Sequence, residues 1–219
     1  GGSGFVGRNI IKFLGPDYDI YAPTSSQLDL TDEKEVEKYF QNKFFDVIIH
    51  CAIKGGRRNE IDSSFILQGN LQMFFNLMNN KNRFDRLINF SSGADFDKTK
   101  NININNHNLE KSYPIRPYDM SKNRYWDVFY IKDLINILKY YLDNPTLDLD
   151  NEMELIYQDL LSLKDVAELI NNLDKNKVKI RVDDNTRDLD YLGNKSYGVN
   201  LPIELIGLKK GLEEIYNAL

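Results

Sequence analysis

Three glycines at intervals of three residues, Gly1, Gly4 and Gly7, open the chain and run directly into a helical pattern of apolar residues that ends at Leu14. The first N–H groups of a helix have no backbone partner, and glycines allow an anion to approach them closely. The spacing therefore predicts a pyrophosphate site at the start of a helix. A tight turn that binds nothing, or an artificial linker, has the same composition, so the later motifs must decide between these interpretations.

Strands and helices alternate along the rest of the chain. The apolar runs FDVIIHCA (45–52) and RLINFSS (86–92) are typical of strands buried on both faces of a parallel sheet. The other predicted strands are 18–23, 128–131, 153–158 and 178–182, and the predicted helices are 31–40, 65–78, 134–142, 162–173 and 204–219. This alternation predicts an α/β fold, with a Rossmann-type doubly wound parallel sheet over 1–161 and a small C-terminal α/β substrate lobe over 162–219.

Two of the predicted helices carry start signals. Asp32 is followed three residues later by Glu35, and Ser162 by Asp165, which are the spacings of a capping box. In such a box the first side chain accepts from the backbone of the third helical residue, whose own side chain accepts in return. Each helix is therefore expected to begin directly after its capping residue.

The composition excludes several classes of partner. A formal net charge of −5, with scattered Lys and Arg residues, provides no attraction to nucleic acid or to an anionic membrane. The single cysteine, Cys51, excludes an internal disulfide framework and favours a reducing compartment; on a buried strand it is expected to act as a small apolar residue. No apolar run approaches membrane-spanning length. These features predict a cytoplasmic globular protein without a metal site.

The segment after the first predicted strand favours one dinucleotide over another. About twenty residues beyond the glycines, an NAD-binding Rossmann fold usually has an acidic residue for the ribose hydroxyls. The stretch YAPTSSQ has no carboxylate, whereas Thr24, Ser25 and Ser26, with Arg8 nearby, are suited to hydrogen-bond a 2′-phosphate. This pattern favours NADP, with NAD as the alternative. Asp29 follows as a candidate acceptor for the adenine amino group.

The pattern Tyr-x-x-x-Lys, which places a phenol one helical turn from an ammonium group, occurs three times. The pairs are Tyr39/Lys43, Tyr118/Lys122 and Tyr191/Lys195. The first pair precedes a strand and so lies at the wrong end of the sheet for catalysis, and the third surrounds a glycine in a predicted loop. The second begins a helix and follows the strand end at Ser92, so it is the candidate catalytic pair.

Such a pair is suited to proton transfer beside a nicotinamide. A free phenol has a pKa of about 10 and is a poor base at neutral pH. The Lys122 ammonium would lower the pKa of the Tyr118 phenol, and the Ser92 hydroxyl would hold the substrate oxygen. Tyr118 would then move a proton to or from that oxygen while a hydride is transferred at the nicotinamide.

Seven segments follow one another like the signatures of a known family. They are GGSGFVG, LDLTD, DVIIHCAIKGG, INFSSGADF, YDMSK, FYIKDL and SLKDVAELI. The set resembles the extended short-chain dehydrogenases that act on nucleotide sugars, the NAD-dependent epimerase/dehydratase family, over nearly the whole chain. The variant AIKGG and the short gap before LDLTD are most similar to the GDP-fucose synthase and dTDP-4-keto-rhamnose reductase branch.

This resemblance implies a site and its partners. Ser92, Tyr118 and Lys122 would form a catalytic triad, and Lys54 with Ser92 would contact the substrate. The residues implied to line the cofactor are Gly1, Gly4, Phe5, Val6, Gly7, Thr24, Ser25, Asp29, Leu30, Cys51, Ala52, Ile53, Tyr118 and Lys122. The implied partners are a nucleotide-diphosphate sugar and a second copy of the chain in a homodimer, within cell-surface glycan biosynthesis.

The sequence departs from the family pattern at three places. The family has a strand before the first glycine, and several dozen residues where Tyr125 here directly precedes Trp126. A sheet without those segments would leave backbone groups unpaired, so we expect a first strand and a segment at the 125/126 junction to be missing from this sequence. Ala94 stands where fucose-synthase-like enzymes have a cysteine, which argues against 3,5-epimerisation.

Three functions are compatible with these features. The first is an NADP-dependent reductase of a nucleotide-linked 4-keto-6-deoxysugar, and the second is a nucleotide-sugar 4-epimerase that retains tightly bound NAD. The third is a non-catalytic dinucleotide-binding sensor or scaffold. The combination of Ser92, Tyr118 and Lys122 favours an enzyme, because a sensor has no use for a proton relay. The first interpretation is the preferred one.

Overall fold

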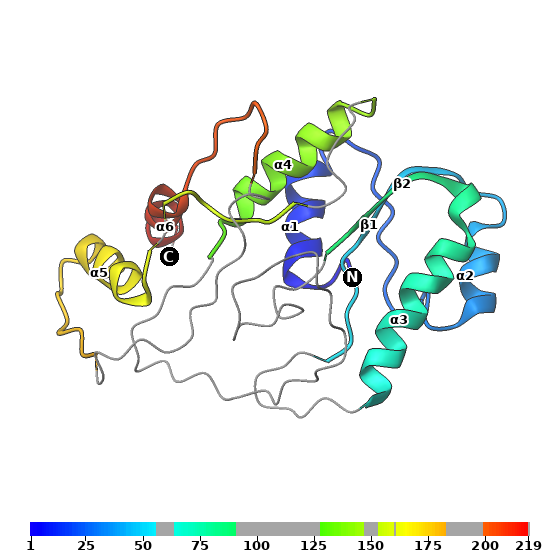
Figure 1. Ribbon diagram of the computed structural model, residues 1–219, viewed down its shortest axis with the longest axis horizontal. Helices are drawn as coiled ribbons and strands as arrows, with labels where there is room; N and C mark the ends of the chain where they lie inside the picture. The colour runs from blue at the N-terminus through cyan, green and yellow to red at the C-terminus, as the bar shows by residue number, and fades with distance from the viewer. Residues whose placement is uncertain (56–63, 91–127, 147–152, 160, 183–198, 219) are drawn as a thin grey trace, which may run out of the picture. The chain divides into compact units, whose positions relative to one another are not determined.

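The computed structural model describes residues 1–55, 64–90, 128–146, 153–159, 161–182 and 199–218 (Figure 1). The chain divides into two compact units, Gly1–Phe90 and Ser91–Leu219. The division between residues 161 and 162 that the sequence favours stays a prediction. Within the described ranges, no helix has both the length and the apolar character needed to cross a membrane.

The first unit contains a parallel pair of strands joined through a helix. Its elements in chain order are α1 (Phe5–Leu14), α2 (Glu33–Phe40), β1 (Phe45–His50), α3 (Ser64–Asn79), the 3₁₀ turn η1 (Lys81–Arg83) and β2 (Phe84–Asn89). β1 and β2 run side by side in parallel, with Phe45 opposite Phe84 and His50 opposite Asn89 (Figure 1). Parallel strands need a crossover connection, which α3 supplies. The predicted α/β fold with a parallel sheet is confirmed.

The core of this unit packs against the strand pair. Its buried members are Leu28, Val36, Phe40, Leu77 and Phe84, from α2, α3, β2 and the loop before α2. Ile48 and its register partner Leu87 turn their side chains toward this cluster. The prediction that β1 is buried on both faces is wrong in degree, because His50 is the one buried residue of the strand and the others are half-buried or exposed.

The predicted start signals of two helices are found, one of them with a different partner. The Asp32 carboxylate accepts from the backbone N–H groups of Lys34 (2.9 Å) and Glu35 (3.0 Å), so α2 begins as expected. The Glu35 carboxylate does not return the bond to Asp32; it accepts from the N–H of Asp29 at 3.0 Å. This contact ties the preceding loop to the helix.

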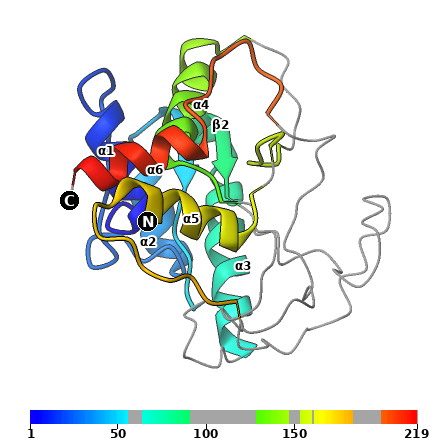
Figure 2. The ribbon, with the colours of Figure 1, turned by 90° about the vertical axis from the view of Figure 1, so that its left-hand side faces the viewer.

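Three helices form the described part of the second unit: α4 (Ile131–Asp143), α5 (Leu163–Leu173) and α6 (Leu208–Asn217). α5 and α6 lie side by side (Figure 2). The capping box at the start of α5 is confirmed, with reciprocal bonds between Ser162 and Asp165. α6 begins later than predicted because Gly207 has a φ of 83°, a left-handed conformation incompatible with a helix. The segment 128–131 is not a strand, since Ile131 already begins α4.

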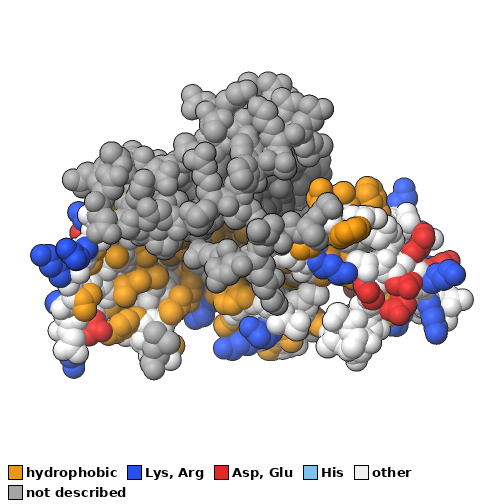
Figure 3. All heavy atoms as spheres, turned by 90° about the horizontal axis from the view of Figure 1, so that it is seen from below, with side chains coloured by type: hydrophobic (Ala, Val, Ile, Leu, Met, Phe, Trp, Pro, Cys, Tyr) orange, Lys and Arg blue, Asp and Glu red, His pale blue; other side chains and the backbone are white. Residues whose placement is uncertain are grey.

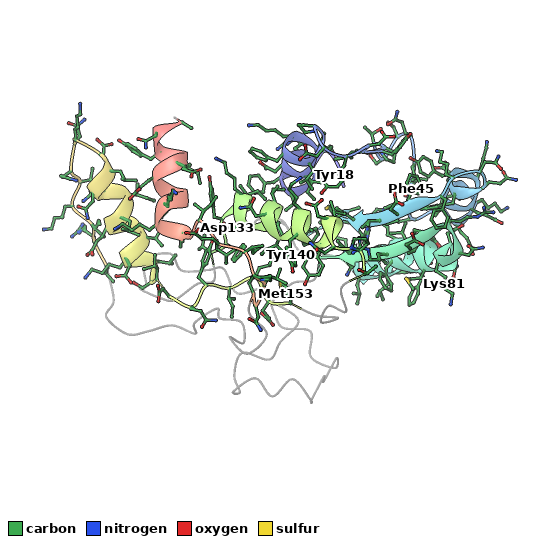
Figure 4. The ribbon with its side chains drawn as sticks, turned by 90° about the horizontal axis from the view of Figure 1, so that it is seen from above. Tyr18, Phe45, Lys81, Asp133, Tyr140 and Met153 are labelled. Carbon is green, nitrogen blue, oxygen red and sulfur yellow. The ribbon has the colours of Figure 1, made fainter. Side chains whose placement is uncertain are left out.

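A buried carboxylate at the start of α4 joins three segments of the second unit. Asp133, labelled in Figure 4, is completely buried. It accepts from the N–H groups of Ile206 (2.7 Å) and Gly207 (3.0 Å), just before α6, and from the Tyr157 hydroxyl. Burial raises the pKa of Tyr157, so its phenol stays protonated and donates. Asp133, the acidic residue of the FYIKDL motif, therefore has a structural role.

Three predicted strands are extended segments without a sheet ladder in the described part of the chain. These are 18–23, 153–158, which has an isolated bridge at Glu154, and 178–182. A strand needs a neighbour for its backbone groups, and the described sheet consists of β1 and β2. Asn171 replaces such a neighbour for Val178: its side chain donates to the Val178 carbonyl (3.0 Å) and accepts from the Val178 N–H (2.8 Å).

Candidate dinucleotide-binding site

Within the described residues, the glycine-rich turn provides no acceptor for the first N–H groups of α1. Gly4 is the N-cap residue and provides no side-chain hydrogen bond. Its own N–H donates to the Gly1 carbonyl (3.0 Å), and the first intrahelical donor is the N–H of Arg8, which reaches the Gly4 carbonyl (2.9 Å). The N–H groups of Phe5, Val6 and Gly7 come before that bond. They form the positive end of the helix, where an anion is stabilised.

The turn fits closely against the carboxyl end of β1, beside which the N-terminus lies (Figure 1). A Cβ atom on Gly7 would lie 2.3 Å from the Gly1 carbonyl oxygen. A Cβ atom on Gly1 would lie 2.3 Å from the carbonyl carbon of Cys51 and 2.5 Å from the Ala52 nitrogen. Side chains are therefore excluded at both positions. This is a cradle of the kind that a pyrophosphate requires, so the residues present fit a dinucleotide.

The structure brings several predicted site residues to this edge of the sheet. Gly1 meets Cys51 and Ala52, and Gly7 packs on Gly1, through the contacts just described. On the other side, a Cβ atom on Gly2 would lie 3.0 Å from the Ala22 Cβ, two residues before the predicted 2′-phosphate segment. The carboxyl edge of β1 is where ligands bind in an open α/β sheet.

The two ionisable residues at the end of β1 are both favoured in their neutral forms. Burial raises the pKa of the Cys51 thiol to about 11, so it stays protonated at neutral pH. Burial also lowers the pKa of His50, so its imidazole is favoured in the neutral form. Both observations agree with the interpretation of these residues as parts of a packed strand.

Hydroxyl groups gather in the turn that the sequence assigns to the 2′-phosphate. The Thr24 hydroxyl lies 2.9 Å from that of Ser26 and donates to the Gln27 side chain at 3.0 Å. The N–H of Thr24 donates to the same Gln27 oxygen at 2.9 Å. Thr24, Ser25 and Ser26 are exposed, as is Arg8 on the first turn of α1. The turn thus offers neutral polar groups to a ligand and no carboxylate.

Asp29 is held as an exposed anionic acceptor. Its carboxylate accepts from the Thr31 N–H (2.9 Å) and the Thr31 hydroxyl (2.7 Å). These hydrogen bonds, together with the charge of Lys54, lower the pKa of Asp29. The loop is attached to α3 through Leu30, whose carbonyl accepts from the Asn76 side chain at 2.8 Å. An exposed carboxylate of fixed direction is suited to accept from an amino group.

Asn70, for which the sequence pattern gives no functional signal of its own, holds the backbone of Lys54. The N–H of Lys54 donates to Oδ1 of Asn70 (2.8 Å), and Nδ2 of Asn70 donates to the Lys54 carbonyl (3.1 Å). The chain then turns at Gly55, which has a φ of 76°. The Lys54 side chain passes over Gly69, where a Cβ atom would lie 3.3 Å from its Cδ. The one signal for Asn70 in the sequence is that it is a polar residue in a helix without charged residues.

The predicted catalytic residues lie outside the described residues. Ser92, Tyr118 and Lys122 belong to this group, as do the 125/126 junction and the third pair, Tyr191/Lys195. Their roles remain predictions. A groove of about 880 Å³ between α5 and α6 lies within the second unit, and none of the predicted site residues lines it.

The first Tyr-x-x-x-Lys pair is described, and its geometry is structural. Nζ of Lys43 lies 3.4 Å from the centre of the Tyr39 ring, a cation–π contact over the face of the ring. The other face of Tyr39 stacks on Phe45, with 6.4 Å between ring centres. Burial raises the pKa of Tyr39, so this phenol is not activated as a base. The pair lies beside Phe45, at the amino end of β1, as the sequence indicates.

Sequence comparison decides the family. The profile described as "NAD dependent epimerase/dehydratase family" matches residues 1–125, more than half of the chain, including the glycine cradle and the predicted triad. The chain belongs to this family. The suspected resemblance is confirmed at the level of the family.

Two curated relatives illustrate the similarity. GDP-L-fucose synthase of Azorhizobium caulinodans is 37% identical over 99 residues, which cover 43% of this chain and 32% of that protein. GDP-L-colitose synthase of Yersinia pseudotuberculosis is 33% identical over 104 residues, 45% of this chain and 33% of that protein. The matched stretch thus spans about a third of the length of these relatives.

Solved structures share the fold at low identity. GDP-mannoheptose C4 reductase from Campylobacter jejuni, with NADP bound, superposes with a TM-score of 0.76 at 13% identity, covering 100% of this chain and 96% of that chain. A GDP-6-OMe-4-keto-L-xylo-heptose reductase from C. jejuni gives a TM-score of 0.66 at 14% identity, with coverages of 100% and 95%. The similarity of fold supports the Rossmann-type architecture of this family member.

Proposed function

We propose that this family member is an NADPH-dependent reductase of a nucleotide-linked 4-keto-6-deoxysugar, with GDP as the nucleotide. The observation that carries the proposal is the glycine cradle at the carboxyl end of β1, which excludes side chains at Gly1 and Gly7. Relatives whose names refer to GDP-linked sugars support the substrate class. The test is oxidation of NADPH by the intact protein in the presence of GDP-4-keto-6-deoxysugars, with dTDP-linked sugars for comparison.

Different residues of the cradle and the surrounding loops would bind different parts of the cofactor. The N–H groups of Phe5, Val6 and Gly7 would bind the pyrophosphate, and Asp29 would accept from the adenine amino group. Leu30, Cys51, Ala52 and Ile53 would line the adenosine and pyrophosphate, while Thr24 and Ser25 would bind the 2′-phosphate. Lys54, which Asn70 holds at the same edge, would contact the substrate diphosphate.

Three residues would carry the proton chemistry. The cofactor, when bound, supplies a hydride. The Ser92 hydroxyl would hold the substrate carbonyl oxygen, and the Tyr118 phenol would donate a proton to that oxygen. Lys122 would hold the nicotinamide ribose and lower the pKa of Tyr118 through its charge.

The hydroxyl turn predicts a preference for NADPH over NADH. We expect the intact protein to bind NADPH about tenfold more tightly or better, because the turn offers donors to a 2′-phosphate and no repelling carboxylate. Fluorescence titration with both nucleotides measures this. Thr24→Glu should reverse the preference, whereas Asn42→Glu, the same charge change on another exposed loop, should not. Tighter NADH binding would count against the reductase, and NAD that copurifies with the protein would favour the 4-epimerase.

The exposed face of α3 supports the proposed homodimer. None of the 16 residues of α3 is charged, and Leu67, Leu71 and Phe75 on one side of the helix are 48–66% exposed although the opposite side packs in the core. Large apolar side chains grouped at the surface commonly mark a contact with another protein. Hydrophobic side chains at the surface of the described part are also visible in the space-filling view (Figure 3). A second copy of the chain would cover this face.

Leu71→Lys is therefore expected to dissociate the dimer, because the interface would have to bury an unpaired ammonium group. Sedimentation velocity over a range of concentrations measures the assembly. The matched control is Ile170→Lys on α5, where the replaced side chain is 43% exposed and lies in the other unit. A monomeric wild-type protein would contradict the homodimer, and a Leu71→Lys protein that stays dimeric would exclude this face as the interface.

A further inference from the structure

Asn76 is a completely buried polar residue in the last turn of α3, and both ends of its amide are bonded. Its Nδ2 donates to the carbonyl oxygen of Leu30 at 2.8 Å, and its Oδ1 accepts from Nε2 of Gln72 at 2.7 Å. A buried amide without partners is strongly destabilising, so these bonds fix the direction of the side chain. Asn76 therefore fixes the position of the Leu30 carbonyl group, in a loop 46 positions earlier in the chain.

The carbonyl that Asn76 holds belongs to the peptide group between Leu30 and Thr31. The N–H at the other end of that peptide group donates to Oδ1 of Asp29 at 2.9 Å. Because a peptide group is planar, its C=O and N–H turn together. A rotation that breaks the bond to Asn76 also turns the N–H away from the Asp29 carboxylate.

Bonds within the loop restrict Asp29 further. Its N–H donates to the Glu35 carboxylate (3.0 Å), and its carbonyl accepts from the N–H of Asp32 (3.0 Å). These contacts lie within the loop and the first turn of α2. The bond to Asn76 attaches the same loop to α3, the helix that follows β1 and so belongs to the frame of the site. Asn76 therefore fixes the direction of the Asp29 carboxylate relative to α3 and the strand that precedes it.

We propose that Asn76 is a positioning residue for recognition of the adenine ring: it orients the Leu30–Thr31 peptide group, and through it the carboxylate of Asp29. The inference rests on the proposed function, in which Asp29 accepts from the adenine amino group. Asn76 lies in the core and acts on the cofactor only through this peptide group. A purely structural asparagine would affect folding but not the choice of base.

The test uses a cofactor analogue that lacks the adenine amino group. Deamino-NADPH carries hypoxanthine, whose oxygen would face the Asp29 carboxylate where NADPH presents a donor. The wild-type intact protein is expected to prefer NADPH over deamino-NADPH by about tenfold or more, since a hydrogen bond to a charged group is lost and two acceptors are opposed. In Asn76→Asp, which removes the donor to Leu30 with little change of volume, the ratio of the two affinities should fall toward one.

Two further variants keep the test informative if a buried carboxylate at position 76 prevents folding. Gln72→Ala leaves Asn76 in place but removes the donor to its Oδ1, and should lower the ratio in the same direction by a smaller factor. Asn79→Ala is the matched control on the same helix, because its amide bonds to the exposed side chain of Glu33 at 3.3 Å. It should leave the ratio unchanged.

A second readout needs no cofactor. Amide hydrogen exchange at Thr31 in the unliganded protein should be faster in Asn76→Asp and Gln72→Ala than in the wild type, and unchanged in Asn79→Ala. The inference would be overturned if folded Asn76→Asp and Gln72→Ala proteins kept the wild-type preference for NADPH over deamino-NADPH, or if their exchange rate at Thr31 were unaltered. A wild-type protein that binds neither nucleotide would instead overturn the proposed function, whatever the exchange rates are.

Discussion

Replacing Tyr118 with phenylalanine in the intact protein should abolish turnover and leave cofactor binding nearly unchanged. The ring remains and only the hydroxyl that would donate the proton is lost. General acid catalysis of this kind contributes roughly 10²–10⁴-fold, so kcat should fall by at least that factor. NADPH oxidation with a GDP-4-keto-6-deoxysugar measures the loss, and fluorescence titration measures the binding.

Three companion variants test the choice of this pair. Lys122→Ala should impair both turnover and cofactor binding, because Lys122 would lower the phenol pKa and hold the nicotinamide ribose. Tyr39→Phe should be nearly silent in catalysis, since that phenol lies in a packed ring cluster beneath Lys43. Tyr191→Phe should be silent as well. Full activity of Tyr118→Phe, or a large loss at either other tyrosine in a folded protein, would show that the catalytic pair is a different one.

Gly7→Ala should prevent cofactor binding. The added Cβ atom would lie 2.3 Å from the Gly1 carbonyl oxygen and 2.7 Å from the Gly2 Cα, and both are backbone atoms that cannot move aside independently. The turn would have to open, and the N–H groups of the first turn of α1 would lose their common direction. We expect the dissociation constant for NADPH to rise by about 100-fold or more, which is about 2.7 kcal/mol. Isothermal titration calorimetry measures it directly.

Gly4→Ala is the graded control for this experiment. A Cβ atom there would lie 3.3 Å from the Gly1 oxygen, and the backbone at Gly4 has a φ of −73° that alanine adopts readily. Its affinity for NADPH should fall much less than that of Gly7→Ala. Thermal denaturation of both variants separates loss of binding from loss of folding. Equal affinities of Gly7→Ala and the wild type would exclude the cradle as the pyrophosphate site.

Local signals in the sequence were sufficient for elements whose cause is local. The helix after the glycines, the cap at Asp32 and the capping box at Ser162 are found where the residues indicate. The parallel strands β1 and β2 overlap the predicted segments 45–52 and 86–92, with β2 beginning two residues earlier and ending at Asn89. Each depends on a periodicity, or on a hydrogen bond that spans a few residues. The choice among the three Tyr-x-x-x-Lys pairs is also a sequence argument, and it agrees with the structural role of Tyr39.

The sequence was insufficient where a segment depends on a distant partner. The residues 18–23 and 178–182 have strand composition, but within the described part of the chain they have no sheet neighbour. α6 begins after Gly207, whose φ of 83° ends the preceding segment, and the N–H groups of Ile206 and Gly207 are bound by Asp133, far away in the sequence. The secondary-structure propensity of a segment carries no information about hydrogen bonds to residues far away in the sequence.

The amino-acid sequence by itself determined the family, the α/β class and the position of the glycine turn, because glycine spacing and apolar periodicity follow directly from the order of residues. The tertiary structure alone decided how the turn is seated against Cys51 and how two asparagines of α3 serve the loops of the site. Asn70 holds the backbone of Lys54, and Asn76 holds the carbonyl of Leu30. An amide side chain can bond to any backbone group within reach, and only packing determines which group that is.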